Sequence, residues 1–130
     1  MRKKIVAGNW KMNLNKNEAE ALFLSLNEAN FSDNVDVLIC PPSIYLFQFS
    51  SQSNGIKIGT QNSSDQNNGA YTGEISAEML SSINVDYALV GHSERREYYK
   101  EDDGFLSGKV DQLLSITLQV LIEFSIQEKI

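Results

Sequence analysis

The sequence is poor in the residues that build disulfides and metal clusters. Its 130 residues include one cysteine, Cys40, and one histidine, His92. A lone cysteine cannot form a disulfide within the chain, and one cysteine with one histidine does not make a metal cluster. We therefore predict a disulfide-free, cytoplasmic protein with no metal site.

Positive charge and long apolar runs are also scarce. Eleven Lys and Arg against 17 Asp and Glu give a formal net charge of −6, which argues against nucleic acid or an anionic membrane surface as the main partner. No apolar run approaches the roughly 20 residues of a membrane helix, and the first residues do not resemble a signal peptide. The sequence also lacks a glycine-rich phosphate loop and a nucleophile-elbow motif.

What the sequence does contain is a repeated alternation of strand-like and helix-like segments. Five apolar runs begin roughly 20 to 30 residues apart, which is typical of strands joined by crossover helices in a parallel sheet. Because these runs are apolar throughout, we expect both faces of the sheet to be covered. The five predicted strands are Lys4–Ala7, Val35–Cys40, Gly55–Gly59, Asp86–Val90 and Leu118–Ile122.

Four helices are predicted between these strands. The first should begin near Lys16, because Asn15 and Glu18 have the spacing of a capping box before a stripe of apolar residues. A weaker helix is predicted at 44–50 and a short one at 74–80. The fourth has an apolar face from Phe105 to Leu114, with Asp102 or Asp103 as its cap.

A polar loop, Gln61–Gly73, separates the third strand from the next helix. Loops of this length are usually functional or disordered, and composition alone favours neither a mobile surface loop nor a functional one.

Unusual polar residues follow three of the predicted strands. In parallel α/β sheets, binding groups gather beyond the carboxyl ends of the strands, so a substrate there could meet all of them. Singly, each has a plain alternative: a solvated lysine, a turn-forming asparagine, a loop histidine. These residues are Asn9 and Lys11, then Gln61 and Asn62, then His92, Ser93 and Glu94.

Two of them form an electrophilic half-site. His92 precedes a predicted helix start at Ser93, and the positive end of a helix dipole disfavours protonation of an imidazole. A neutral imidazole can donate a hydrogen bond to a carbonyl or enolate oxygen. Lys11 would attract an anionic substrate and stabilise developing negative charge. Such a site still needs a base.

Three segments carry a resemblance to a known family. Residues 7–13 (AGNWKMN), 69–76 (GAYTGEIS) and 90–96 (VGHSERR) resemble, in order and spacing, three motifs of the triosephosphate isomerases. The resemblance covers about residues 1 to 115. It implies a (β/α)8 TIM barrel and a cytoplasmic homodimer of glycolysis and gluconeogenesis that needs no metal or other cofactor.

The resemblance also implies roles for individual residues. The family interconverts dihydroxyacetone phosphate and glyceraldehyde 3-phosphate through an enediolate. Asn9 and Lys11 resemble its substrate-binding pair, and His92 resembles the neutral electrophile that moves a proton between the substrate oxygens. Glu94 resembles the carboxylate beside that lysine.

The polar loop resembles the segment that inserts into the other subunit in this family. Thr72 would lie at its tip, and Glu74 would pair with Arg95 of the partner subunit. This resemblance favours a dimer contact for the loop.

The length departs from the family. A TIM barrel needs about 250 residues, so we expect residues 1–130 to be a single incomplete TIM-barrel domain, its N-terminal half, with about four βα units plus a fifth strand. The family's glutamate base, its lid and its phosphate loops have no counterpart in the sequence. Glu123 is a weak candidate for a substitute base, because it lies outside any matching motif. The alternative is a truncated, non-catalytic half-barrel or pseudoenzyme.

Overall fold

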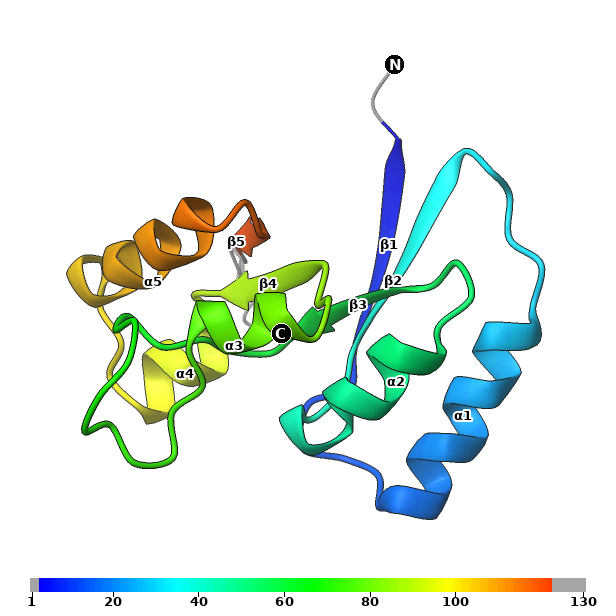
Figure 1. Cartoon of the computed structure of the whole chain (residues 1–130), viewed down its shortest axis with the longest axis horizontal. Coiled ribbons are helices and arrows are strands. Elements are labelled where there is room, and N and C mark those ends of the chain that lie inside the picture. Colours follow the sequence, from blue (N-terminus) through cyan, green and yellow to red (C-terminus); the bar gives the residue numbers. More distant parts are fainter. Residues whose placement is uncertain (1–2, 123–130) are drawn as a thin grey trace, which may run out of the picture.

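Five parallel strands form one sheet in the order in which they occur in the sequence. The structure is a computed structural model that describes residues 3–122 (Figure 1). Every neighbouring pair in the sheet is joined through helical segments, so the fold is an incomplete (β/α) barrel, as predicted. The strands are β1 (Lys4–Asn9), β2 (Val35–Cys40), β3 (Lys57–Thr60), β4 (Tyr87–Val90) and β5 (Gln119–Ile122).

The register of the strands places their carboxyl ends at one edge of the sheet. β1 pairs with β2 from Lys4 opposite Val35 to Asn9 opposite Cys40. The pairings of β2 with β3 and of β3 with β4 are shorter. The segments that follow β1, β3 and β4 therefore start close together, which is the arrangement that the predicted site requires.

Four of the five α-helices in the described residues begin where a side chain caps them. The Asn15 side chain accepts from the Glu18 amide at 3.0 Å, and Glu18 accepts in return from the Asn15 amide, which confirms the predicted capping box. Asp102 caps α5 in the same way. The helices are α1 (Lys16–Glu28), α2 (Leu46–Gln52), α3 (Ala77–Ser82), α4 (Ser93–Tyr98) and α5 (Asp103–Ser115), and a 3-10 turn, η1 (Ser43–Tyr45), precedes α2.

The start of α3 differs most from the prediction. α3 begins at Ala77 rather than Glu74, because the Ser76 hydroxyl accepts from the Met79 amide at 3.2 Å and fixes the first turn there. The two residues before that cap continue the polar loop. Glu74 is consequently left exposed on the loop instead of lying on a helix.

The main core lies between the sheet and its helices. Phe23 of α1 stacks on Phe49 of α2 with ring centroids 4.3 Å apart, and both side chains are fully buried. The same core contains outward-facing residues of β2, β3 and β4 and the buried faces of α3 and α5, among them Ile39, Ile58, Ala88, Leu80 and Leu113.

The other face of the sheet carries a much smaller cluster, formed by Leu38, Cys40, Tyr87 and Leu89. A Cβ at Gly59 would lie 2.7 Å from the Cys40 sulfur, so only glycine lets this buried cysteine pack against β3. Cys40 therefore has a packing role.

The expectation that both faces are covered is wrong for β1. Ile5 is 43% exposed and Val6 is 60% exposed, on opposite faces of that strand. The reason is that β1 lies at the edge of the sheet and pairs with β2 alone among the described strands. Within residues 3–122, no helix is both long enough and apolar enough to cross a membrane.

Candidate active site

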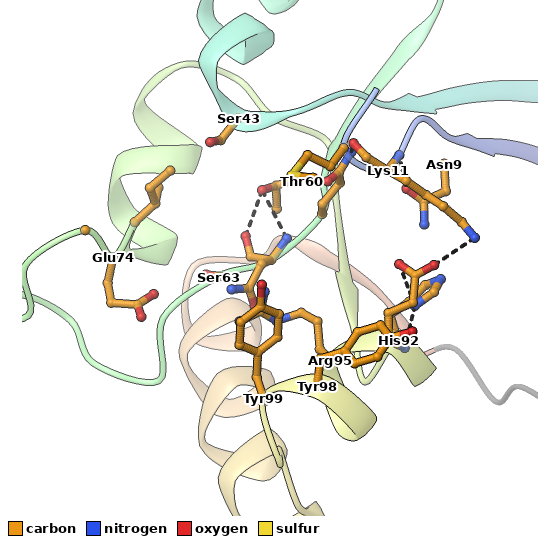
Figure 2. Close-up of a pocket in the computed structure, with 16 residues that line it drawn as sticks. Asn9, Lys11, Ser43, Thr60, Ser63, Glu74, His92, Arg95, Tyr98 and Tyr99 are labelled. Atoms are coloured by element: carbon orange, nitrogen blue, oxygen red, sulfur yellow. Dashed lines mark hydrogen bonds and ion pairs between the residues drawn. The ribbon is translucent and has the colours of Figure 1, made fainter. Parts of the chain in front are cut away.

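The polar residues singled out at the strand ends surround one open cavity of about 450 Å³ (Figure 2). Asn9 ends β1, Gln61 and Asn62 follow β3, and His92 follows β4. Lys11 and Glu94 complete the predicted set. Of the predicted rim, only Ser93, the first residue of α4, is missing from the lining.

His92 is the N-cap of α4, as the sequence predicted. Its Nδ1 accepts a hydrogen bond from the Glu94 amide at 3.1 Å, and its side chain is largely buried. A neutral ring that accepts at Nδ1 carries its proton on Nε2. His92 is thereby arranged as a hydrogen-bond donor through Nε2.

Lys11 and Glu94 form an ion pair at the edge of the cavity, with 2.8 Å between Nζ and Oε1. The hydrogen bond from Lys11 holds the pKa of the Glu94 carboxyl below its ordinary value. Asn9 contributes locally, since its Oδ1 accepts from the Lys11 amide at 2.9 Å. A fixed cation and a neutral hydrogen-bond donor thus face the same space, where they could stabilise an oxyanion.

A base is not evident among the described residues. The carboxylates that line the cavity are Glu74 and Glu94. Glu94 is bound to Lys11, and Glu74 lies on the opposite side of the cavity from His92 (Figure 2). Glu123, the substitute base considered from the sequence, lies outside the described residues.

Comparison with known proteins decides the family. A family model described as triosephosphate isomerase matches residues 4–124. The chain belongs to the triosephosphate isomerase family. It is 49% identical over 117 residues to the triosephosphate isomerase of Marinobacter nauticus, covering 88% of this chain and 46% of that protein.

Other relatives give the same result. The triosephosphate isomerase of Phocaeicola vulgatus is 48% identical over 123 residues, which cover 92% of this chain and 49% of that protein. The triosephosphate isomerase of Emericella nidulans is 41% identical over 121 residues, which cover 92% of this chain and 49% of that protein. The chain spans about half the length of the curated relatives it matches.

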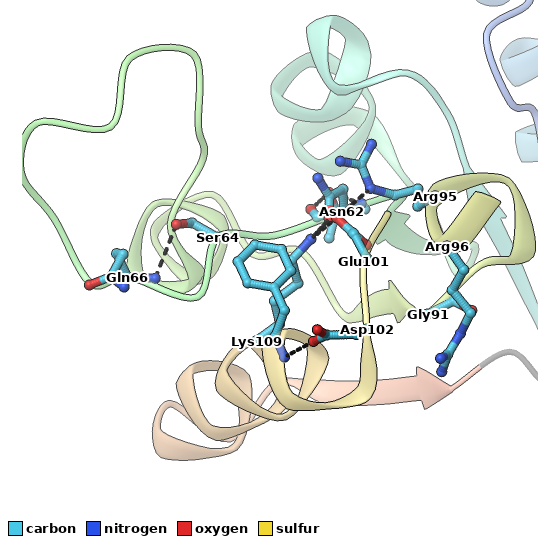
Figure 3. Close-up of polar contacts among 11 residues, drawn as sticks. Asn62, Ser64, Gln66, Gly91, Arg95, Arg96, Glu101, Asp102 and Lys109 are labelled. Atoms are coloured by element: carbon cyan, nitrogen blue, oxygen red, sulfur yellow. Dashed lines mark hydrogen bonds and ion pairs between the residues drawn. The ribbon is translucent and has the colours of Figure 1, made fainter. Parts of the chain in front are cut away.

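A buried ion cluster supports the site of this family member, and the sequence reasoning missed it (Figure 3). Glu101 Oε2 accepts from Lys109 Nζ at 2.7 Å and from Arg95 Nε at 3.1 Å. Lys109 Nζ also donates to Asn62 Oδ1 at 2.6 Å. Two residues of the cavity lining, Asn62 and Arg95, are therefore fixed from behind.

The signal for this cluster was present in the sequence. Lys109 lies three residues after Leu106 and four before Leu113, on the buried stripe of α5. A charged residue within an apolar stripe indicates a buried partner, because burying an unpaired charge is costly. Glu101 has no comparable signal, since it precedes the helix in a polar segment.

The residues predicted for a dimer contact lie at the site or next to it. Glu74 and Arg95 both line the cavity, and Thr72 lies on the exposed loop before Glu74. Turns shape this loop: Gly69 and Gly73 have φ of 116° and 90°, and the Glu74 amide donates to the Tyr71 carbonyl at 3.0 Å. Exposed apolar side chains also line the cavity, namely Met12, Tyr98 and Tyr99.

Proposed function

We propose that the chain supplies the electrophilic half of a triose-phosphate isomerase site. The reaction is the interconversion of dihydroxyacetone phosphate and D-glyceraldehyde 3-phosphate through an enediolate, in glycolysis and gluconeogenesis. The observation that carries the proposal is that the Lys11–Glu94 ion pair and the capped His92 face one cavity.

The geometry and the family resemblance support a role for each residue. Asn9 and Lys11 bind the substrate, and the Lys11 charge also stabilises the enediolate. His92 donates from Nε2 to the substrate oxygens and moves a proton between them. Glu94 holds the Lys11 ammonium at the edge of the cavity, where their hydrogen bond is 2.8 Å long.

The carbon-bound proton must be removed by a group outside this half-site. Lys11 is cationic at neutral pH, His92 is engaged with the oxygens, and Glu94 is paired. We propose that the base, a lid and the groups that grip the phosphate come from the half of the relatives' length that this chain does not match. The second candidate is a non-catalytic half-barrel, and the pairing of Glu94 with Lys11 favours it for these 130 residues alone.

We also propose a cytoplasmic homodimer. The loop with Thr72 and Glu74 would enter the partner subunit, where Glu74 meets Arg95 of that subunit. Support comes from the exposed apolar side chains beside the cavity, Met12 and Tyr98 among them, because apolar patches rimmed by polar groups are typical of protein interfaces. The net charge of −6 favours neither nucleic acid nor an anionic membrane as a further partner.

The test is reassembly. The chain is mixed with the separately expressed C-terminal half of the Marinobacter nauticus relative, and turnover of glyceraldehyde 3-phosphate is measured. We expect turnover from the mixture and none from either half. His92→Gln in the mixture should lower turnover by about 100-fold or more, since it removes the proton-transfer group.

A second variant tests the proposed role of the Lys11 charge. Lys11→Met in the mixture should weaken binding of a phosphate-bearing inhibitor as well as slow turnover, because the charge acts on both the bound substrate and the intermediate. Turnover that His92→Gln leaves intact would overturn the proposed roles. His92-dependent turnover from the 130 residues alone would instead show that they contain a base.

A further inference from the structure

Gln61 joins the loops that follow two other strands. Its side-chain Nε2 donates to the Lys11 carbonyl at 2.8 Å and to the Cys40 carbonyl at 2.9 Å. An amide NH2 group has two hydrogens, so this one side chain uses both of them on backbone oxygens. It ties together the carboxyl ends of β1, β2 and β3. The proposed chemistry gives Gln61 no role.

The hydrogen bond from Gln61 is made to a residue, Lys11, whose backbone conformation is unusual. Lys11 has φ of 55°, in the left-handed region that residues other than glycine adopt unfavourably. Such a conformation persists only where the surroundings hold it. Side chains hold both of its peptide groups, because the Asn9 Oδ1 accepts from the Lys11 amide and Gln61 donates to the Lys11 carbonyl.

This backbone conformation sets the direction of the lysine side chain. From the left-handed turn, Lys11 Nζ reaches Glu94 Oε1 at 2.8 Å, at the N-terminal end of α4 (Figure 2). Both side chains are about half exposed, and exposed ion pairs are weak in isolation. The ion pair by itself is therefore not enough to fix the strained loop. The two hydrogen bonds of Gln61, of which the one to the Cys40 carbonyl is partly buried, supply the additional restraint.

We infer that Gln61 is a positioning residue for Lys11. It holds the left-handed turn against the end of β2 and so keeps the ammonium group at Glu94, beside His92. The inference rests on the proposed function for its biological meaning, since a misplaced catalytic cation costs rate. The structural statement, that Gln61 determines the Lys11–Glu94 contact, can be tested without turnover.

The test follows the Glu94 carboxyl by 13C NMR during an acid titration of the full, labelled chain. Gln61→Leu removes both N–H donors of the side-chain amide and leaves a side chain of similar size. Gln61→Glu keeps the shape, but a carboxylate cannot donate. The matched control is Gln48→Leu, because Gln48 is also half-buried and its amide donates to Glu20 instead of to the backbone. Lys11→Met gives the reference titration of a Glu94 without its partner.

We expect the Glu94 pKa to lie below its ordinary value in the parent chain and in Gln48→Leu, because the hydrogen bond from Lys11 lowers it. In both Gln61 variants it should rise to the Lys11→Met value, and the Lys11 13Cα and 13Cβ shifts should lose the signature of positive φ. If Gln61→Leu loses the dispersed NMR spectrum of a folded chain, the titration of Gln61→Glu is used to test the inference. Gln61 variants that titrate like the parent chain would overturn the inference.

Kinetics of the reassembled mixture separate this inference from the proposed function. Gln61→Leu should lower kcat/KM about tenfold or more, and the Gln48→Leu control should not lower it. A mixture without any turnover, combined with the expected Glu94 titrations, would refute the function and leave the positioning role standing. Normal turnover in both Gln61 variants with unshifted Glu94 titrations would refute the positioning role alone.

Discussion

The two faces of the sheet differ in how fully this chain covers them. On the outer face, side chains of β2, β3 and β4 meet those of the helices in a continuous buried core. On the inner face, the buried cluster consists of Leu38, Cys40, Tyr87 and Leu89, and β1 is exposed on both faces.

The difference follows from how a (β/α) barrel is built. Each βα unit brings the helix that covers its own strand, so the outer core is assembled locally. Inner side chains pack in layers contributed by alternate strands around the whole barrel. With five described strands, the outer core is nearly complete and the inner one is not.

The largest effect is expected in the outer core. Phe49→Ala removes a ring that is 0% exposed and contacts Phe23, Trp10 and Tyr45. We expect a loss of about 4 kcal/mol in the free energy of unfolding, measured with urea. The paired variant on β1, Val6→Ala, should cost less than about 1 kcal/mol. Equal losses would contradict the contrast between the covered strands and the exposed strand β1.

Substitution in the buried ion cluster of Glu101, Lys109 and Arg95 should lower the free energy of unfolding nearly as much. Lys109→Met removes one partner of a side chain, Glu101, that is 4% exposed. We expect a loss of about 3 kcal/mol, because a buried carboxylate is left with a single cation. Lys100→Met, at an exposed lysine, is the control and should change little. The double variant with Glu101→Leu should recover part of the loss, and no recovery would argue against burial as the cause.

The inner cluster should respond to alkaline pH. Burial, together with the nearby Asp36 and Asp86 carboxylates, raises the pKa of Tyr87 above its ordinary value of 10.0. The unfolded chain therefore loses this proton first, and the free energy of unfolding should fall as the pH rises above about 10. Tyr87→Phe should remove that part of the fall. Parallel curves for the two proteins between pH 9 and 11 would show that Tyr87 is not responsible.

The smallest effect is expected at the edge of the inner face. Ile5 is 43% exposed, so Ile5→Ser removes little buried apolar area. We expect a change within about 0.5 kcal/mol. A large loss on urea unfolding would mean that β1 is covered in solution, for example by a second copy of the chain.

Local patterns predicted most of the fold. The Asn15–Glu18 capping box fixed the start of α1 because its two hydrogen bonds lie within one turn. Val35–Cys40 is the strand that was predicted. The start of α3 was misplaced because Ser76 and Glu74 both suit a helix terminus, and only the Ser76 bond decides between them.

The site was predicted in composition but not in detail. The spacing after the strands brought Lys11, His92 and Glu94 together, since parallel strands end at one edge. The Gln61 side chain meets the Lys11 carbonyl across 50 positions of sequence, and Glu101 meets the Lys109 side chain across 8. The helical and strand periodicities of a sequence do not predict such pairs. The exposure of β1 was missed for a related reason, because an apolar run looks the same at the edge of a sheet as in its centre.

The strand order has a consequence for how the chain folds during synthesis. Every strand in the described part pairs with the one made just before it, as in Lys4 with Val35 and Tyr87 with Gln119. No pairing waits for a distant strand, so each ladder closes one loop of moderate length. A nascent chain leaving the ribosome can therefore add its βα units one at a time, each on the edge exposed by the last.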